Sequence, residues 1–257
     1  MGLPLIVSIL VAGCSTDGES GSMDDNLPEG TDVSQNRKAV GESAPDLLDG
    51  TNFTELFIEI FYVSGMEPSA TALDNFETFL KERLHKPDGV SIALTEIPSP
   101  DQAMYSITDI RSLEDEIRTA YNQKGTLKVF GLFLDGEYAE NTENGSVLGV
   151  AYRNTSFVLF EETIRKFSGQ PLAPSTTVLE TTVLNHEFGH LLGLVNAGTP
   201  LQSAHQDEAH GRHCTTEDCL MFWTAETGEG LINMISGGNI PELDAACLAD
   251  LQANGGK

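Results

Sequence analysis

Residues 186–190, His186-Glu187-Phe188-Gly189-His190, combine two imidazoles with a carboxylate at a spacing that could bind a metal ion. On a helix, residues four positions apart lie one turn apart on the same face, so both histidines could share one ion. Glu187 lies about 100° round the helix from His186, where its carboxylate can reach a metal-bound water. The pattern predicts two ligands, His186 and His190, and a general base, Glu187. In a plainer interpretation they are ordinary helix residues.

Gly193 follows His190 by three residues. This spacing resembles the metzincin proteases, zinc enzymes in which a glycine ends the active-site helix and lets the chain turn back toward the metal. The resemblance implies a third ligand at position 196, but that residue is Asn196. A neutral amide is a poor zinc ligand, so either the third ligand comes from elsewhere or the site is weak.

The loop after Asn196 contains four candidate third ligands: His205, Asp207, His210 and His213. Residues 213–221 read H-C-x4-C-x-M, which resembles the archaemetzincins, where this segment continues directly from H-E-x-x-H-x-x-G-x-x. Here seventeen residues, 196–212, are inserted between the two parts. The resemblance implies that His213 is the third ligand and Met221 the Met-turn residue beneath the metal. The other loop residues and Asn196 remain open as alternatives.

Residues 2–13 form an uncharged apolar stretch that is too short to span a bilayer and ends at Cys14. Its length is that of a signal-peptide core, although no Lys or Arg precedes it. Residues 11–14, Val-Ala-Gly-Cys, resemble the lipobox of bacterial lipoproteins. The resemblance implies a signal peptide over residues 1–13 and lipidation of Cys14. The alternative is an N-terminal strand that ends in a buried cysteine.

Residues 15–52 are rich in Gly, Ser, Asp and Glu, and such a composition cannot bury enough apolar surface to order the chain. We therefore expect residues 14–52 to be a lipidated, flexible acidic spacer and residues 53–257 to be a metalloprotease catalytic domain. This organisation predicts a protein of the bacterial cell envelope, lipid-anchored at the outer membrane and facing either the periplasm or the cell surface.

The chain has 257 residues, 40% of them hydrophobic, and a net charge of −25. The hydrophobic content suffices for a buried core, and the negative charge argues against nucleic acid as a partner. No apolar run reaches the roughly 18 residues that a membrane-spanning helix needs. We expect membrane contact through the N-terminal lipid only, and a monomer.

Archaemetzincins carry a further C-x-x-C that completes a second, four-cysteine zinc site. Only Cys247 follows Cys219 here, so a four-cysteine site is excluded once Cys14 is lipidated. In an oxidising compartment Cys214 and Cys219 could pair as a disulfide beside His213, with Cys247 unpaired. The alternative is three free, partly buried thiols.

Hydrophobic periodicity switches between strand-like and helix-like along the domain, which predicts an α/β (α+β) fold with a mostly parallel, twisted sheet. The metzincin resemblance adds an antiparallel edge strand, an active-site helix and a loop-rich C-terminal subdomain. We predict strands over 53–63, 90–97, 127–134, 147–152 and 156–160, and helices over 68–86, 103–121, 175–194 and 241–253.

Gly149, Val150, Ala151 and Tyr152 resemble the metzincin edge strand, which binds an extended peptide by strand addition; the alternative is a plain edge strand. Together these features predict a zinc-dependent metalloendopeptidase with one catalytic Zn²⁺ and a peptide or protein substrate. A non-catalytic surface lipoprotein, whose degenerate metal site binds a peptide or glycan, is the alternative that Asn196 favours. A structural zinc module would need a fourth protein ligand, such as His205 or His210.

Overall fold

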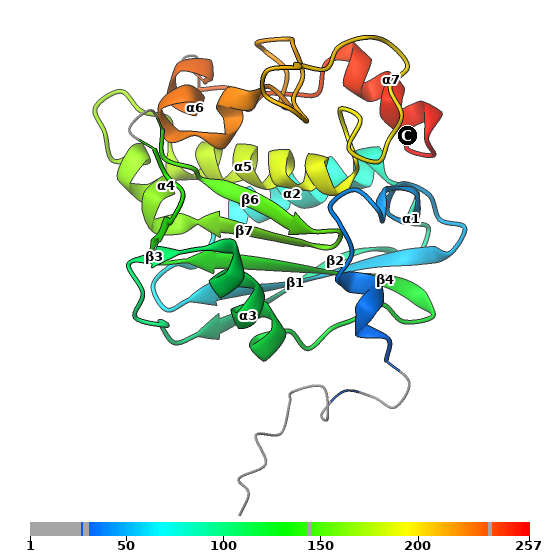
Figure 1. The fold of residues 1–257 in the computed structure, drawn as a ribbon, viewed down its shortest axis with the longest axis horizontal. Coiled ribbons are helices and arrows are strands. Elements are labelled where there is room, and N and C mark those ends of the chain that lie inside the picture. The colour runs from blue at the N-terminus through cyan, green and yellow to red at the C-terminus, as the bar shows by residue number, and fades with distance from the viewer. Residues whose placement is uncertain (1–26, 28–30, 143–144, 236–237) are drawn as a thin grey trace, which may run out of the picture.

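A five-stranded sheet forms the centre of the computed structural model, which describes residue 27 and residues 31–142, 145–235 and 238–257 (Figure 1). Strands β1, β2, β4 and β7 run parallel, and β6 runs antiparallel to β7 at one edge. Across the sheet the order is β2 (Gly89–Ile97), β1 (Phe53–Val63), β4 (Gly125–Leu134), β7 (Ser156–Phe160) and β6 (Gly149–Arg153). The predicted fold class is confirmed.

Helices cover both faces of this sheet. α2 (Ala70–Arg83) and α5 (Thr176–Leu191) lie on one face, and α3 (Ile107–Ile117) lies on the other (Figure 1). Successive strand residues point to opposite faces, so Ile58 and Ile60 of β1 join the larger core cluster whereas Phe61 joins the smaller one. Because both faces are covered, the central strands are apolar along most of their length.

The elements that follow β1 and do not belong to the sheet or its three long helices are short. They are β3 (Met104–Tyr105), β5 (Glu137–Tyr138), α4 (Glu161–Ser168), η3 (Trp223–Glu226), α6 (Gly228–Met234) and α7 (Ala245–Ala253). Of these, α6 and α7 lie above α5 on the side away from the sheet (Figure 1). In the described part of the chain, no helix has the length and apolar character needed to cross a bilayer.

The folded domain begins before residue 53, so the prediction of a flexible spacer is wrong for residues 33–52. This segment contains η2 (Val33–Asn36) and α1 (Ala44–Leu48), whose two leucines are fully buried in the larger core cluster. The buried Asn36 side chain donates to the Lys128 carbonyl at 2.9 Å. A few apolar residues and specific hydrogen bonds therefore order a segment of polar composition. The predicted signal peptide and Cys14 lie outside the described residues.

Two buried carboxyl groups meet where α4, α5 and the start of α2 come together. Glu161 is fully buried with Arg165 Nε 2.5 Å from its Oε1, and the Ser69 N–H donates to Oε2 of the buried Glu180 at 2.9 Å. Burial, assisted by the charge of Glu180, raises the pKa of Glu161 to about 9. Burial also raises the pKa of Glu180. Glu161 is therefore protonated at neutral pH.

Because the pKa of Glu161 is raised in the folded state, the protein should become less stable as the pH rises and this carboxyl loses its proton. The folded carboxyl binds its proton more tightly than the unfolded one, so its contribution is complete below the unfolded pKa of about 4.3. That contribution is lost as the pH rises through the folded pKa of about 9. Glu161→Gln should flatten this decline in the free energy of unfolding, measured by urea unfolding between about pH 5 and about pH 9. The exposed neighbour Glu162 provides a control, Glu162→Gln, that should keep the wild-type slope. Equal slopes in all three proteins would contradict the assignment.

Candidate metal centre

The H-E-x-x-H residues lie in the last two turns of α5, which are buried between the sheet and the C-terminal segments. His186 is fully buried, Glu187 is 1% exposed and His190 is 6% exposed. The helix begins at the N-cap Ser175, whose side chain accepts a hydrogen bond from the Val178 N–H. Three polar side chains that are almost fully buried need partners in the protein. The surrounding segments supply these partners.

Met221 lies directly against this helix at Gly189. The Met221 side chain is fully buried, and a Cβ added to Gly189 would lie 2.4 Å from its Sδ. Only glycine leaves room for this approach. The neighbouring residue also contacts the helix, because the Leu220 carbonyl accepts a hydrogen bond from His186 Nδ1 at 2.7 Å.

Gly189→Ala should lower the free energy of unfolding by about 1–3 kcal/mol, the usual cost of overpacking a core. In a Met221→Ala background the same change should instead raise it by about 1 kcal/mol, because the clash is gone and alanine is the better helix former. Urea unfolding of the four proteins measures both effects as a double-mutant cycle. Additive effects of the two changes would show that Met221 does not crowd Gly189.

Gly193 ends the helix and redirects the chain. Its φ is +70°, a conformation that side-chain-bearing residues rarely adopt, and its carbonyl accepts from the Thr199 N–H at 2.9 Å. The chain then leads Asn196 into an exposed position, where its amide donates to Gln206 Oε1. Asn196 is thus not among the side chains that converge on the metal centre.

The structure brings His213 to the two helix histidines. The Nε2 atoms of His186 and His190 lie 3.1 Å apart, and the His213 ring centroid is 5.4 Å and 5.1 Å from theirs. His213 Nδ1 bonds to the His210 carbonyl at 2.7 Å, as His186 Nδ1 does to Leu220. A carbonyl can only accept, so both Nδ1 atoms carry a proton, and in the neutral imidazole each Nε2 atom offers a lone pair. This is the tautomer that binds a metal.

Burial also keeps the second helix histidine neutral. It lowers the pKa of His190 to about 4, with the charges of His186 and His213 acting in the same direction. A neutral imidazole is the form that coordinates a metal, so His190 fits a zinc ion without further change. At His213 burial opposes protonation, but the hydrogen bond to Glu226 together with the charge of that carboxylate outweighs it and raises the pKa.

The other predicted candidates for the third ligand lie elsewhere. His205 Nε2 lies 2.7 Å from Asp250 Oδ2, close to α7. His210 is stacked on Trp223 with ring centroids 4.3 Å apart, and its Nδ1 lies 2.6 Å from Asp207 Oδ2. These residues therefore face different partners from His213.

Glu187 connects the helix to the edge strand. Its Oε2 accepts the Ala151 N–H at 2.7 Å, whereas its buried Oε1 has no hydrogen-bond partner. Burial, and secondly the negative charge of Glu226, raise the pKa of Glu187 well above its usual value. One oxygen is therefore held by β6 and the other is left to accept a proton.

Sequence reasoning missed Glu226, the fourth side chain at this centre. Its Oε1 lies 2.9 Å from His213 Nε2, 3.1 Å from His190 Nε2 and 3.6 Å from His186 Nε2. The donor atoms of these four residues lie within 4.8 Å of one another. Glu226 comes from η3, and no motif distinguishes it among the 39 acidic residues of the chain.

A cleft of about 340 Å³ opens onto the metal centre between β6 and the loop that carries His213. Gly149, Val150 and Ala151 of the predicted substrate edge strand line it. Tyr152 does not line it, because its side chain is buried in the smaller core cluster on the other face of the sheet. Val150 packs against the same cluster, but it is only partly buried and still borders the cleft.

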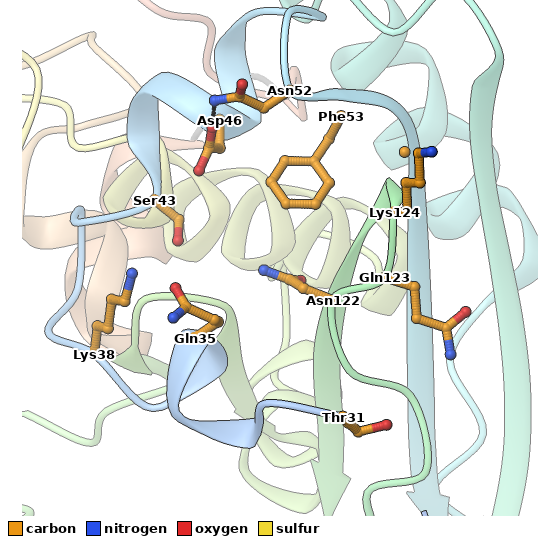
Figure 2. Close-up of a pocket in the computed structure, with 11 residues that line it drawn as sticks. Thr31, Gln35, Lys38, Ser43, Asp46, Asn52, Phe53, Asn122, Gln123 and Lys124 are labelled. Atoms are coloured by element: carbon orange, nitrogen blue, oxygen red, sulfur yellow. Dashed lines mark hydrogen bonds between the residues drawn. The ribbon is translucent and has the colours of Figure 1, made fainter. Parts of the chain in front are cut away.

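A larger cavity of about 620 Å³ lies elsewhere (Figure 2). Figure 2 shows Ser43, Asp46 and Asn52 of the N-terminal segment facing Asn122 and Lys124, which precede β4. None of the four metal-centre residues lines it. Donor chemistry, rather than cavity size, thus identifies the candidate site.

The predicted disulfide between Cys214 and Cys219 is wrong, because both are free, as is Cys247. Cys219 Sγ lies 3.7 Å from Cys247 Sγ. A second group of donor atoms within 4.8 Å of one another consists of His205, Cys214, Asp244 and Cys247. The fold brings the start of α7 to these thiols, a contact that spacing along the chain did not reveal.

No protein-family model matches the chain, and no curated protein matches its sequence significantly. An archaemetzincin structure from Methanopyrus kandleri has 19% sequence identity and a TM-score of 0.50, with 78% of this chain and 96% of that chain covered. The likeness shows that this chain shares the archaemetzincin fold.

Two further solved structures are similar at lower scores. A zinc-dependent peptidase from Methanocorpusculum labreanum has 15% identity and a TM-score of 0.47, covering 76% of this chain and 99% of that chain. Metalloproteinase-II from Bacteroides fragilis has 15% identity and a TM-score of 0.44, covering 80% of this chain and 55% of that chain.

Proposed function

We propose that this protein is a zinc-dependent metalloendopeptidase of metzincin type. The observation that carries the proposal is the convergence of three histidine Nε2 atoms beside the buried carboxylate of Glu187, at a cleft bounded by the edge strand. In this proposal His186, His190 and His213 hold one catalytic zinc ion, and Met221 is the Met-turn residue beneath it. When bound, zinc lowers the pKa of a coordinated water and polarises the scissile carbonyl.

Glu187 is the general base in this proposal. Its Oε1 has no other partner and takes the proton of the attacking water, then delivers it to the leaving amine. The Ala151 N–H fixes the other oxygen, so the carboxylate keeps one orientation through both proton transfers. The substrate is a peptide or protein that lies extended along the outer edge of β6.

Glu187→Gln should lower peptide cleavage by about 100- to 10,000-fold, the usual contribution of a general base. The full chain with zinc is incubated with a diverse peptide pool, and the products are identified by mass spectrometry. Glu229→Gln, which changes a carboxylate of α6 outside the four-residue centre, should cleave like the wild type. Wild-type protein that holds zinc but cleaves nothing would contradict the proposal.

A second, structural ion would fit the group of His205, Cys214, Asp244 and Cys247. The His205 ring is oriented for this role, because Asp250 holds its Nε2 while its Nδ1 lies 3.4 Å from Cys214 Sγ. Two thiolates, an imidazole and a carboxylate are donors that zinc accepts. The archaemetzincin resemblance also implies a second zinc ion, although there four cysteines hold it.

This assignment predicts two zinc ions per chain. Cys247→Ser together with Cys214→Ser should reduce the stoichiometry from two ions to one, measured by inductively coupled plasma mass spectrometry after gel filtration. His186→Ala should also leave one ion, but at the other group. A wild-type stoichiometry of one that the cysteine changes do not alter would exclude the second ion.

The cellular setting is also part of the proposal. The lipobox resemblance at Cys14 supports a lipid-anchored protein of the bacterial cell envelope, and the negative charge supports a monomer without nucleic-acid partners. Binding of a peptide or glycan without cleavage is the second candidate function. The contact of Glu226 with all three histidines favours it, because a fourth protein ligand can exclude water from the ion.

A further inference from the structure

We infer that Glu226 is a direct ligand of the zinc ion, so that the resting centre holds three imidazoles and one carboxylate. The inference rests on the proposed metal site, but not on its being catalytic. It assigns a role to a residue outside the H-E-x-x-H motif and outside the H-C-x4-C-x-M segment.

The first argument is the number of acceptors that meet at one point. Oε1 of Glu226 lies 2.9–3.6 Å from the Nε2 atoms of His186, His190 and His213. The Nδ1 atoms of His186 and His213 donate to carbonyls, so in the neutral imidazoles, the form that binds a metal, the Nε2 atoms present lone pairs toward the carboxylate. Lone pairs facing one another repel, and a cation between them turns the repulsion into coordination.

The second argument is that the backbone holds Glu226 in this position. The Glu226 carbonyl accepts the Leu148 N–H at 2.9 Å, and the Gly228 N–H donates to the Ser146 carbonyl at 3.0 Å. An isolated bridge also pairs Thr227 with Val147. The segment around Glu226 thus extends the pairing of the sheet just before β6, so its carboxylate is presented by a fixed backbone.

The third argument concerns charge and exposure. Glu187 and Glu226 place two carboxylates at one cleft, and a divalent cation compensates the repulsion between them. The Glu226 side chain is 33% exposed, whereas the His186 side chain is fully buried. Glu226 therefore lies on the solvent side of the centre, where a catalytic zinc site ordinarily keeps its water.

Glu226 would thus hold the ion together with the three histidines, on the side of the centre that faces the cleft. With zinc bound, hydrolysis would need room at the ion for a water besides these four side chains. The carbonyl of Glu226 is bonded to Leu148, which precedes the edge strand, so a peptide that adds to this edge meets the same segment.

The test compares the full chain with Glu226→Gln, which keeps the shape of the side chain but replaces a good ligand with a poor one. Zinc affinity, measured by competition with a chromophoric chelator, should fall at least about tenfold at the three-histidine centre; loss of even an outer-shell partner costs about 10- to 100-fold. The absorption spectrum of the Co²⁺-loaded protein should also change, because a water replaces the carboxylate. All proteins compared also carry Cys214→Ser and Cys247→Ser, so that only the three-histidine centre binds zinc. The protein with these two changes alone is the parent protein.

Two controls bracket this result. Glu162→Gln removes an exposed carboxylate of α4 that lies outside the centre, and it should match the parent protein in affinity and spectrum. His213→Ala removes a proposed histidine ligand and should weaken binding at least as much as Glu226→Gln. Unchanged affinity and spectrum in Glu226→Gln, with loss in His213→Ala, would overturn the assignment of Glu226 while leaving the three-histidine site intact.

Failure of the proposed function gives a different result. A parent protein whose zinc binding depends on Glu226 but which cleaves no peptide would support the ligand and contradict the peptidase. Peptide cleavage that increases in Glu226→Gln at saturating zinc would support both. A parent protein that binds neither zinc nor Co²⁺ would overturn both.

Discussion

The burial of α5 is the constraint on which the rest of the centre depends. A helix that buries His186, Glu187 and His190 must receive a partner for each polar group, since an unpaired buried group costs free energy. The Leu220 carbonyl serves His186, and the Ala151 N–H serves Glu187. The protein segments that pack around the helix are therefore the same segments that define its chemistry.

The edge strand takes part in both carboxylate positions. β6 holds Glu187 through Ala151, and the residues just before it hold the backbone of Glu226. The two acidic groups thus approach the three histidines from one side of the sheet, although 39 positions separate them along the chain. A peptide that binds along this edge would contact the element that positions both carboxylates.

The inserted loop, residues 196–212, is organised by its contacts with the segments that follow. The Asp207 N–H donates to the His213 carbonyl at 2.8 Å, and Asp250 of α7 accepts from the Gln202 N–H at 2.6 Å. These bonds lead the chain back to α5, so His213 reaches the centre despite the insertion. The same course of the loop places His205 beside Cys214, the residue for which the sequence suggested a disulfide with Cys219.

Local patterns in the sequence were enough to predict the strands, the active-site helix, the pairing of His186 with His190, and the turn at Gly193. Such features depend on residues within a few positions of one another, whose geometry is set by the helix or strand itself. The archaemetzincin resemblance pointed to His213 but left His205 and His210 open, and the tertiary structure brings His213 to the centre. The tertiary structure also placed Glu226 there, because both depend on contacts between distant segments.

The same distinction explains the two wrong predictions. Residues 33–52 look disordered by composition, yet Asn36 and the leucines of α1 find partners only once β1, β4 and the loop before residue 126 are assembled. The side chains of Cys214 and Cys219 do interact, but both thiols are free. The start of α7 brings Asp244 to Cys214 and Cys247 to Cys219 as further partners. Composition and spacing therefore determined the elements and the first two ligands. Long-range packing, which no local pattern encodes, decided which other side chains completed the site.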